Sequence, residues 1–254
     1  MVGKLESLEA ELELLWQAGC EGVWQDGDEV VAYFPDRQAL PVAGAWAPAD
    51  DEDYLARYYA DLKPVYLKTL VVAPTHTEVG LSAGQKPLWL DPGMAFGSGH
   101  HETTYLALQA LEALTLRDKD VLDIGAGSGI LALAADLLGC RSAEGIDIDE
   151  ATLSVAEENA RLNRSRAVFE HATLANVAAE SADVIIANLY AELHQQLEPD
   201  YTRVLRSEGE LIVTGILEAK LPGVVAVLET SFTLLETRTK NEWALVWARC
   251  KGQV

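Results

Sequence analysis

The stretch VLDIGAGSGILALAA, residues 121–135, restricts the possible folds of this chain more than any other part of it. It consists of a short apolar run, a turn with three glycines and a longer apolar run with helical character. Gly125 and Gly127 allow the backbone to turn sharply and approach a ligand, and Gly129 allows a helix and a strand to pack closely. A strand, a glycine turn and a helix in this order predict an α/β fold with a nucleoside site beside the turn.

The chain repeats this alternation of strands and helices from about residue 85 onward. Strand-like runs are Val121–Ile124, Ala143–Ile148, Ala167–Glu170, Val184–Asn188, Leu211–Thr214, Thr233–Thr237 and Ala244–Ala248, and helical patterns are Ile130–Leu138, Ala151–Asn163, Ala191–Leu205 and Leu221–Thr230. We therefore expect a doubly wound, seven-stranded, mostly parallel sheet. Only TKNEW separates the last two strands, so they must form an antiparallel hairpin, because parallel neighbours need a longer crossover.

The N-terminal part has a separate pattern and a strong negative charge. Residues 1–60 contain 13 acidic residues against Lys4, Arg37 and Arg57, which gives −10 of the chain's net −21. Such a field repels a nucleic acid backbone and attracts a basic protein, although plain solubility explains it equally well. We expect a small α/β domain for substrate recognition over 1–50, a connecting helix over 51–65, and the large sheet within 66–254.

Composition favours a cytoplasmic protein of 254 residues. The N-terminus lacks the basic and apolar regions of a signal peptide, and no run is long enough to span a membrane. Cys20, Cys140 and Cys250 lie far apart and form no metal-binding motif. We expect a monomer without a metal, since the adjacent His100 and His101 converge poorly on one ion.

Two acidic residues indicate which nucleoside the turn binds. Asp147 ends the next strand, 22 residues after Gly125, where a carboxylate can accept hydrogen bonds from both ribose hydroxyls. The dinucleotide pattern would need glycine at position 130, but the chain has Ile130. Asp123 would repel a pyrophosphate, whereas it suits the ammonium group of S-adenosylmethionine. We expect S-adenosylmethionine as cofactor.

Asn188 follows the fourth strand, at the edge where α/β sheets place their ligands. Its carboxamide oxygen can accept a hydrogen bond from an amine and direct the nitrogen lone pair toward a methyl carbon. A strand-ending Asn that caps the next helix is the simpler alternative.

Four segments together carry a resemblance to a known family. They are DPGMAFGSGHHETT at 91–104, VLDIGAGSGILALAA at 121–135, GIDIDEATLSVAEENARLN at 145–163 and IIANLY at 185–190. Together they resemble the methyltransferases that modify large-subunit ribosomal protein eleven. The first segment differs from the family pattern mildly, with Ser98 in place of threonine and Glu102 where proline is common.

The resemblance implies a class I methyltransferase that trimethylates lysine ε-amino groups and an N-terminal α-amino group of a basic ribosomal protein. It implies cofactor contacts at Thr104, Gly125, Asp147 and Asn188, in a pocket also shaped by Asp123, Gly127 and Gly129. The segment 91–104 would close over the methionine end of the cofactor. There Phe96 would shield the sulfonium or line the amine channel, and His101 would serve either as a general base or only to order the loop.

One family feature is missing, and two other functions remain open. The region after the third strand reads EHATLANV and lacks the usual Asp for the adenine amino group, so backbone groups near Ala172 and Thr173 would have to serve. A methyltransferase acting on a nucleic acid nitrogen would use Asn188 equally well, but the acidic first domain argues against it. A fold that binds the cofactor without turnover is the second alternative.

Overall fold

The structure is a computed structural model, and it describes residues 2–4, 14–15, 18–20, 22–26, 29–34, 36–40, 42–46, 63–75, 77–91 and 99–251. The chain divides into two compact units, Met1–Asp61 and Leu62–Val254. The predicted connecting helix over 51–65 lies mostly outside the described residues. Within the described part, no helix is long and apolar enough to cross a membrane.

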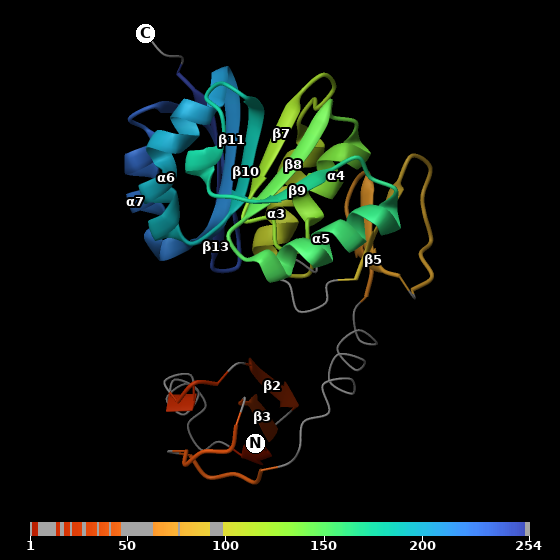
Figure 1. Ribbon diagram of the computed structural model, residues 1–254, viewed down its shortest axis with the longest axis vertical. Coiled ribbons are helices and arrows are strands. Elements are labelled where there is room, and N and C mark those ends of the chain that lie inside the picture. Colours follow the sequence, from red (N-terminus) through yellow and green to blue (C-terminus); the bar gives the residue numbers. More distant parts are fainter. Residues whose placement is uncertain are drawn as a thin grey trace. The chain divides into compact units, whose positions relative to one another are not determined.

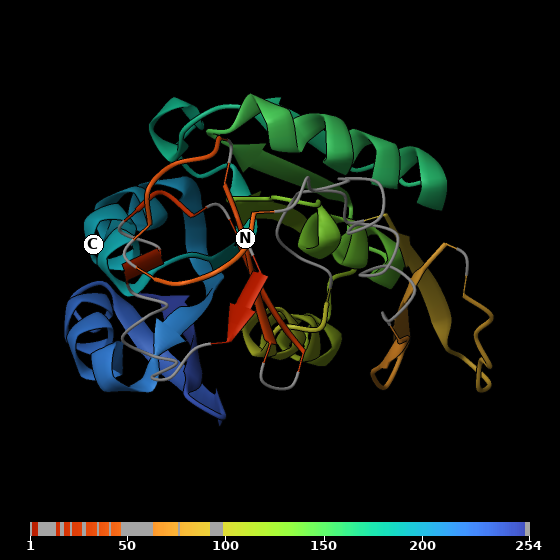
Figure 2. The ribbon, with the colours of Figure 1, turned by 90° about the horizontal axis from the view of Figure 1, so that it is seen from below.

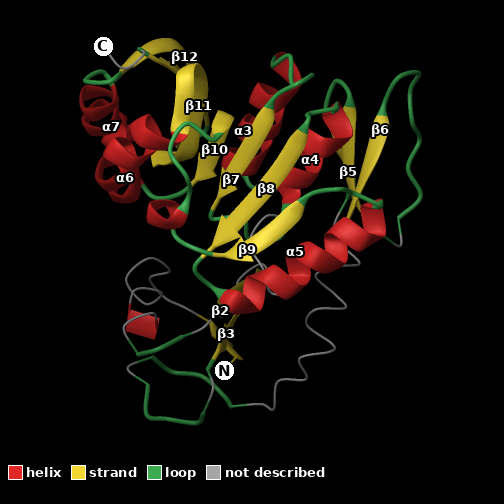
Figure 3. Ribbon diagram, turned by 45° about the horizontal axis from the view of Figure 1, so that its top comes forward, coloured by secondary structure: helices red, strands yellow, loops and turns green. Residues whose placement is uncertain are grey.

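The larger unit contains the predicted seven-stranded sheet. Its strands are β7 (Asp120–Ile124), β8 (Ser142–Asp147), β9 (Val168–His171), β10 (Ala182–Asn188), β11 (Leu205–Leu217), β12 (Phe232–Lys240) and β13 (Trp243–Cys250), in the order β12-β13-β11-β10-β7-β8-β9. Strands β11, β10, β7, β8 and β9 pair with one another in parallel, and β13 pairs antiparallel with both β11 and β12. The predicted fold class is therefore confirmed, and β10, β7, β8 and β9 lie side by side in Figure 3.

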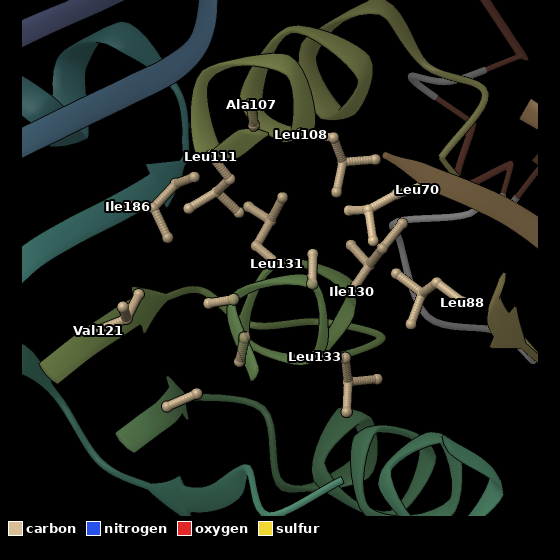
Figure 4. Packing of buried hydrophobic residues seen from close by; sticks show 14 of the residues in the cluster. Leu70, Leu88, Ala107, Leu108, Leu111, Val121, Ile130, Leu131, Leu133 and Ile186 are labelled. Atoms are coloured by element: carbon tan, nitrogen blue, oxygen red, sulfur yellow. The ribbon is translucent and has the colours of Figure 1, made fainter. Parts of the chain in front are cut away.

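Alternating residues of the central strands supply two hydrophobic cores, one on each face of the sheet. Val184 and Ile186 of β10 join a core with α3 (Glu102–Ala113) and α4 (Ile130–Leu138), whereas Ile185 and Ala187 join a core with α6 (Ala191–Val204) and α7 (Leu221–Leu228). Figure 4 shows the first core, with apolar side chains from α3, α4 and the strands pointing toward one another. Both faces of a parallel sheet are covered in this way because its crossover helices lie on both sides.

Helix α5 (Glu150–Asn163) runs from the end of β8 toward a second sheet that the sequence did not predict. This sheet has the order β4-β5-β6, with β4 (Val65–Tyr66), β5 (Leu70–Pro74) and β6 (Lys86–Leu90). It is drawn in orange in Figure 1 and Figure 2, beside α4 and α5. Its buried residues Leu70, Val72 and Leu88 belong to the same core as α3 and α4, so it extends the large unit.

The smaller unit contains a three-stranded antiparallel sheet in the order β1-β3-β2. The strands are β1 (Val2–Lys4), β2 (Gly22–Asp26) and β3 (Glu29–Tyr33). The segment EVVAY at 29–33 forms β3. Near the N-terminus the described residues include Leu14 and Leu15 in helical conformation.

Candidate active site

The glycine turn between β7 and α4 has the conformation that only glycine adopts readily. Gly125, Gly127 and Gly129 have φ of 71°, 51° and 80°. A β-carbon at Gly125 would lie 2.6 Å from Leu189 Cδ2, and one at Gly129 would lie 2.7 Å from the Phe169 ring. The turn is therefore pressed between the end of β10 and the ring on β9, and no other residue fits at these two positions without displacing a neighbour.

Asp147 at the end of β8 contacts this turn directly. Its Oδ2 accepts a hydrogen bond from Gly127 N at 2.9 Å, and its Oδ1 accepts one from Asp149 N at 3.0 Å. Each carboxylate oxygen has a further lone pair, so the side chain can accept more hydrogen bonds. Ile148, which sequence reasoning missed, follows at once and is 75% exposed.

Asp123 lies below the turn and is fully buried. Its Oδ2 accepts a hydrogen bond from Ala132 N at 3.1 Å, in the first turn of α4, while among the described groups its Oδ1 has no hydrogen-bond partner. Burial, with a smaller contribution from the nearby charge of Asp147, raises the pKa of Asp123 to about 7, although the hydrogen bond from the Ala132 amide opposes the shift. Burying a carboxylate oxygen without a hydrogen-bond donor costs free energy, and a cationic ligand beside this atom would reduce that cost.

Asn188 and Thr104 join the end of β10 to the start of α3 by a hydrogen bond. Asn188 ends β10, and its Nδ2 donates to Thr104 Oγ1 at 3.4 Å; Thr104 lies in the first turn of α3 and is 1% exposed. The next strand makes room with Gly215, whose φ is 84° and whose β-carbon would lie 2.3 Å from Leu189 O and 3.0 Å from Asn188 Oδ1. Sequence reasoning missed Gly215, because a lone glycine in a strand gives no sign of the residue across from it.

His194 on α6 contacts β11 beside Gly215, and the sequence analysis did not single this residue out. It is fully buried on α6, with Nε2 at 2.8 Å from Thr214 O and Nδ1 at 3.0 Å from Tyr201 Oη. Burial lowers its pKa to about 4, although the backbone carbonyls beside it oppose the shift. A neutral histidine therefore fixes the residue that precedes Gly215.

His101 caps α3. Its Nδ1 accepts a hydrogen bond from Thr103 N at 3.3 Å and lies 2.8 Å from Thr103 Oγ1, and its ring meets Trp243 edge-on with centroids 4.9 Å apart. Asn241 in the β12–β13 turn donates to Glu102 at 2.7 Å. These contacts hold the start of α3 against the hairpin, which favours the loop-ordering role of His101 over the general-base role.

Three predicted site residues and the predicted absence of a metal remain to be placed in the structure. Phe96 lies outside the described residues. The amide groups of Ala172 and Thr173 donate to Asp147 O at 3.1 Å and to Asn176 Oδ1 at 3.2 Å, so a backbone contact to adenine would depend on carbonyl oxygens. Over the described ranges no group of three or more His, Cys, Asp or Glu side chains could hold a metal ion.

The strand order and the antiparallel hairpin place the larger unit among the class I methyltransferases. A solved protein from Pyrococcus horikoshii with 16% identity and a TM-score of 0.52 shares this fold. The family model described as ribosomal protein L11 methyltransferase (PrmA) matches residues 11–251, and the chain belongs to that family.

Individual relatives agree with the family model along almost the whole chain. A protein of Thermus thermophilus named ribosomal protein L11 methyltransferase is 45% identical over 96% of this chain and 96% of its own length. One of Deinococcus radiodurans with the same name is 43% identical over 97% of this chain and 96% of its own length. The crystal structure of a ribosomal protein L11 methylase from Lactobacillus delbrueckii subsp. bulgaricus has 32% identity and a TM-score of 0.70, and it covers 75% of this chain and 100% of its own. The family predicted from the sequence is confirmed: the chain is a methyltransferase that uses S-adenosylmethionine.

Proposed function

We propose that this protein transfers methyl groups to lysine ε-amino groups and an N-terminal α-amino group of ribosomal protein L11. The observation that carries the proposal is the meeting of three groups at one edge of the sheet. Asp147 ends β8, the glycine turn ends β7, and Asn188 ends β10, on three neighbouring parallel strands. Ligands of such sheets lie outside the carboxyl ends of the strands.

The residues at this edge fit S-adenosylmethionine. Asp147 would hold the ribose hydroxyls, with the exposed Ile148 beside it offering an apolar face to the adenine ring. The unpartnered Oδ1 of Asp123 favours a cationic amino acid end and opposes a pyrophosphate. When bound, S-adenosylmethionine supplies an electrophilic methyl group on a positively charged sulfur.

Asn188 would orient the incoming amine. Donation from its Nδ2 to Thr104 Oγ1 would leave Oδ1 of the same amide as an acceptor for an amine N–H. An acceptor holds the nitrogen in a defined direction, and alignment of this kind accounts for a large part of the rate of a direct displacement. A lysine amine has a pKa of about 10.4 in water, so the site must also favour its neutral form by excluding water.

The acidic N-terminal unit would bind the substrate. Its charge of −10 over 60 residues suits a basic ribosomal protein, which is synthesised and used in the cytoplasm. We place the enzyme there and expect it to act as a monomer.

The test is a labelling experiment with tritiated S-adenosylmethionine, purified ribosomal protein L11 and, separately, ribosomal RNA. We expect label on the protein alone, and mass spectrometry of its peptides should locate trimethylated lysines and a methylated N-terminus. Label on the RNA would support a nucleic acid methyltransferase instead, and no label in the presence of bound cofactor would indicate a module without turnover.

A further inference from the structure

Two asparagines on α5 bind the free edge of β6. Asn163 Oδ1 accepts from Trp89 N at 2.8 Å and its Nδ2 donates to Trp89 O at 2.6 Å; Asn159 Oδ1 accepts from Asp91 N at 2.8 Å. Four residues of helix advance about 6 Å and two residues of strand about 6.6 Å. Asparagines four apart on α5 therefore match residues two apart on the strand, and the helix replaces the missing neighbour strand.

Asn159 makes a second contact that Asn163 does not make. Its Nδ2 donates to Ser128 O at 2.9 Å, inside the glycine turn, whereas the corresponding Nδ2 of Asn163 also binds Asn159 O at 2.8 Å on its own helix. Asn159 is completely buried. One amide side chain thus joins the glycine turn to the residue with which the DPGMAFGSGHHETT segment begins.

The turn is held at two peptide groups that are separated by a single peptide group. Asp147 accepts from Gly127 N, and Asn159 donates to Ser128 O. A turn with three glycines has little conformational preference of its own, so restraints from outside must fix its shape. Asp147 would share its carboxylate with the ribose when the cofactor binds, whereas the bond from Asn159 remains available to the turn throughout.

We propose that Asn159 is a positioning residue for methyl transfer, which keeps the glycine turn in its cofactor-binding shape and couples it to Asp91. The inference rests on the cofactor position given under Proposed function. It separates Asn159 from Asn163, which binds the same strand but has no role in the turn.

Asn159→Asp and Asn163→Asp form a matched pair for the test. Asp at 159 can still accept from Asp91 N, but its carboxylate faces the Ser128 carbonyl and cannot donate to it. We expect the dissociation constant of S-adenosylhomocysteine and the KM for S-adenosylmethionine to rise at least tenfold in Asn159→Asp, with kcat within about threefold of the parent. In Asn163→Asp both cofactor constants should stay within about twofold of the parent values, even if its Tm falls as much as that of Asn159→Asp. Equal cofactor constants in the two variants would overturn the inference.

A measurement on the unaltered protein covers the case in which Asn159→Asp does not fold. Coupling is reciprocal, so a cofactor that stabilises the turn must also stabilise the bond to Asp91. Saturating S-adenosylhomocysteine should slow hydrogen exchange at the Asp91 amide at least threefold, with no such change at the Trp89 amide. Unchanged exchange at Asp91 would overturn the inference. An error in the cofactor position itself would show separately, as unaltered affinity in Asp147→Asn.

Discussion

Asp147 is the side chain on which cofactor affinity should depend most. In Asp147→Asn the single amide oxygen can accept from Gly127 N or from Asp149 N but not from both, and the charge that strengthens hydrogen bonds from ribose hydroxyls is lost. We expect a loss of roughly 2 to 4 kcal/mol in binding free energy, and a fall in Tm of a few degrees in the absence of cofactor because one backbone amide loses its acceptor. Calorimetric titration measures this, and an affinity within about threefold of the parent would show that the ribose lies elsewhere.

Asp123 should make stability depend on pH. Its folded pKa is about 7 against an ordinary value of 3.8, so between these values the folded protein keeps a proton that the unfolded chain has lost. The stabilisation is complete below about pH 4 and disappears as pH rises through 7, a difference on the order of 2 to 4 kcal/mol. Asp123→Asn keeps an acceptor for Ala132 N and removes the titration.

We therefore expect Asp123→Asn without cofactor to be more stable than the parent at pH 8, and to lose less stability between pH 5 and pH 8. Urea unfolding at the two pH values measures both effects. Its cofactor affinity should fall, because the charge that would face the ammonium group is gone. Parallel pH dependence in the two proteins would mean that Asp123 is already ionised at pH 5.

Asn188 should affect turnover more than binding. In Asn188→Ala the acceptor that would direct the amine is lost, while the cofactor contacts of Asp147 and the turn remain. We expect kcat to fall at least thirtyfold and the dissociation constant of S-adenosylmethionine to change less than threefold. Equal losses in both quantities would assign Asn188 to cofactor binding alone.

At the scale of elements, the amino ends of β7 and β10 carry a cluster of charges remote from the site. Asp183 Oδ2 accepts from Asp120 N at 2.8 Å and from Arg206 at 2.8 Å, and Arg141 forms an ion pair with Asp120. The Arg141 guanidinium holds the pKa of the Asp120 carboxyl well below its usual range. The cluster ties neighbouring strands together at the end opposite the cofactor.

We expect Asp183→Ala to reduce the free energy of unfolding by about 2 to 3 kcal/mol, because it leaves the Asp120 amide without its acceptor and removes one of the two carboxylates that Arg206 contacts. Cofactor affinity should stay within twofold of the parent, since the cluster and the site lie at opposite ends of the strands. Chemical unfolding and calorimetry are the measurements. A large loss of affinity in a folded variant would contradict the separation of stability and binding between the two sheet ends.

Elements with long, regular patterns were predictable from the sequence, and short ones were not. Helix Ile130–Leu138 was predicted with its bounds as observed, because a glycine turn precedes it and Gly139 ends it in a left-handed conformation. The run LVVAP of β5 is only five residues long and buried throughout, so it has no alternation to mark it as a strand.

The same distinction applies to the site. The glycines and Asp147 belong to a local pattern, and the sequence places them on one turn and one strand end. The contact of Asn159 with Asp91 joins residues 68 apart, and that of Asn188 with Thr104 joins residues 84 apart. Pairs of this kind depend on the packing of α5 and α3 against the sheets, which a single sequence does not reveal.

At the scale of the molecule, the two units should divide cofactor binding and substrate binding between them. A variant that starts at Leu62 keeps every described residue of the site. We expect it to bind S-adenosylmethionine within about threefold of the full chain, and to methylate ribosomal protein L11 with kcat/KM at least tenfold lower. Methylation at the full rate would remove the docking role and leave solubility as the explanation of the acidic charge.

Salt should distinguish the full chain from this variant. Exposed charges interact over about 10 Å at 0.1 M ionic strength and over less at higher salt. Raising the salt should therefore increase the KM for ribosomal protein L11 in the full chain and leave that of the shorter variant nearly unchanged.

The position of β13 has a consequence for the order in which the protein can be completed during synthesis. This strand follows β11 and β12 in the chain, yet it lies between them and is bonded to both. When β12 leaves the ribosome it has no neighbour in the sheet, and β11 has only β10. The turn that holds the start of α3 emerges at the same late stage. Translation must therefore pass Trp243 before the hairpin can hold the start of α3, where Thr104 lies, so a shorter nascent chain has every residue of the glycine turn but lacks these contacts.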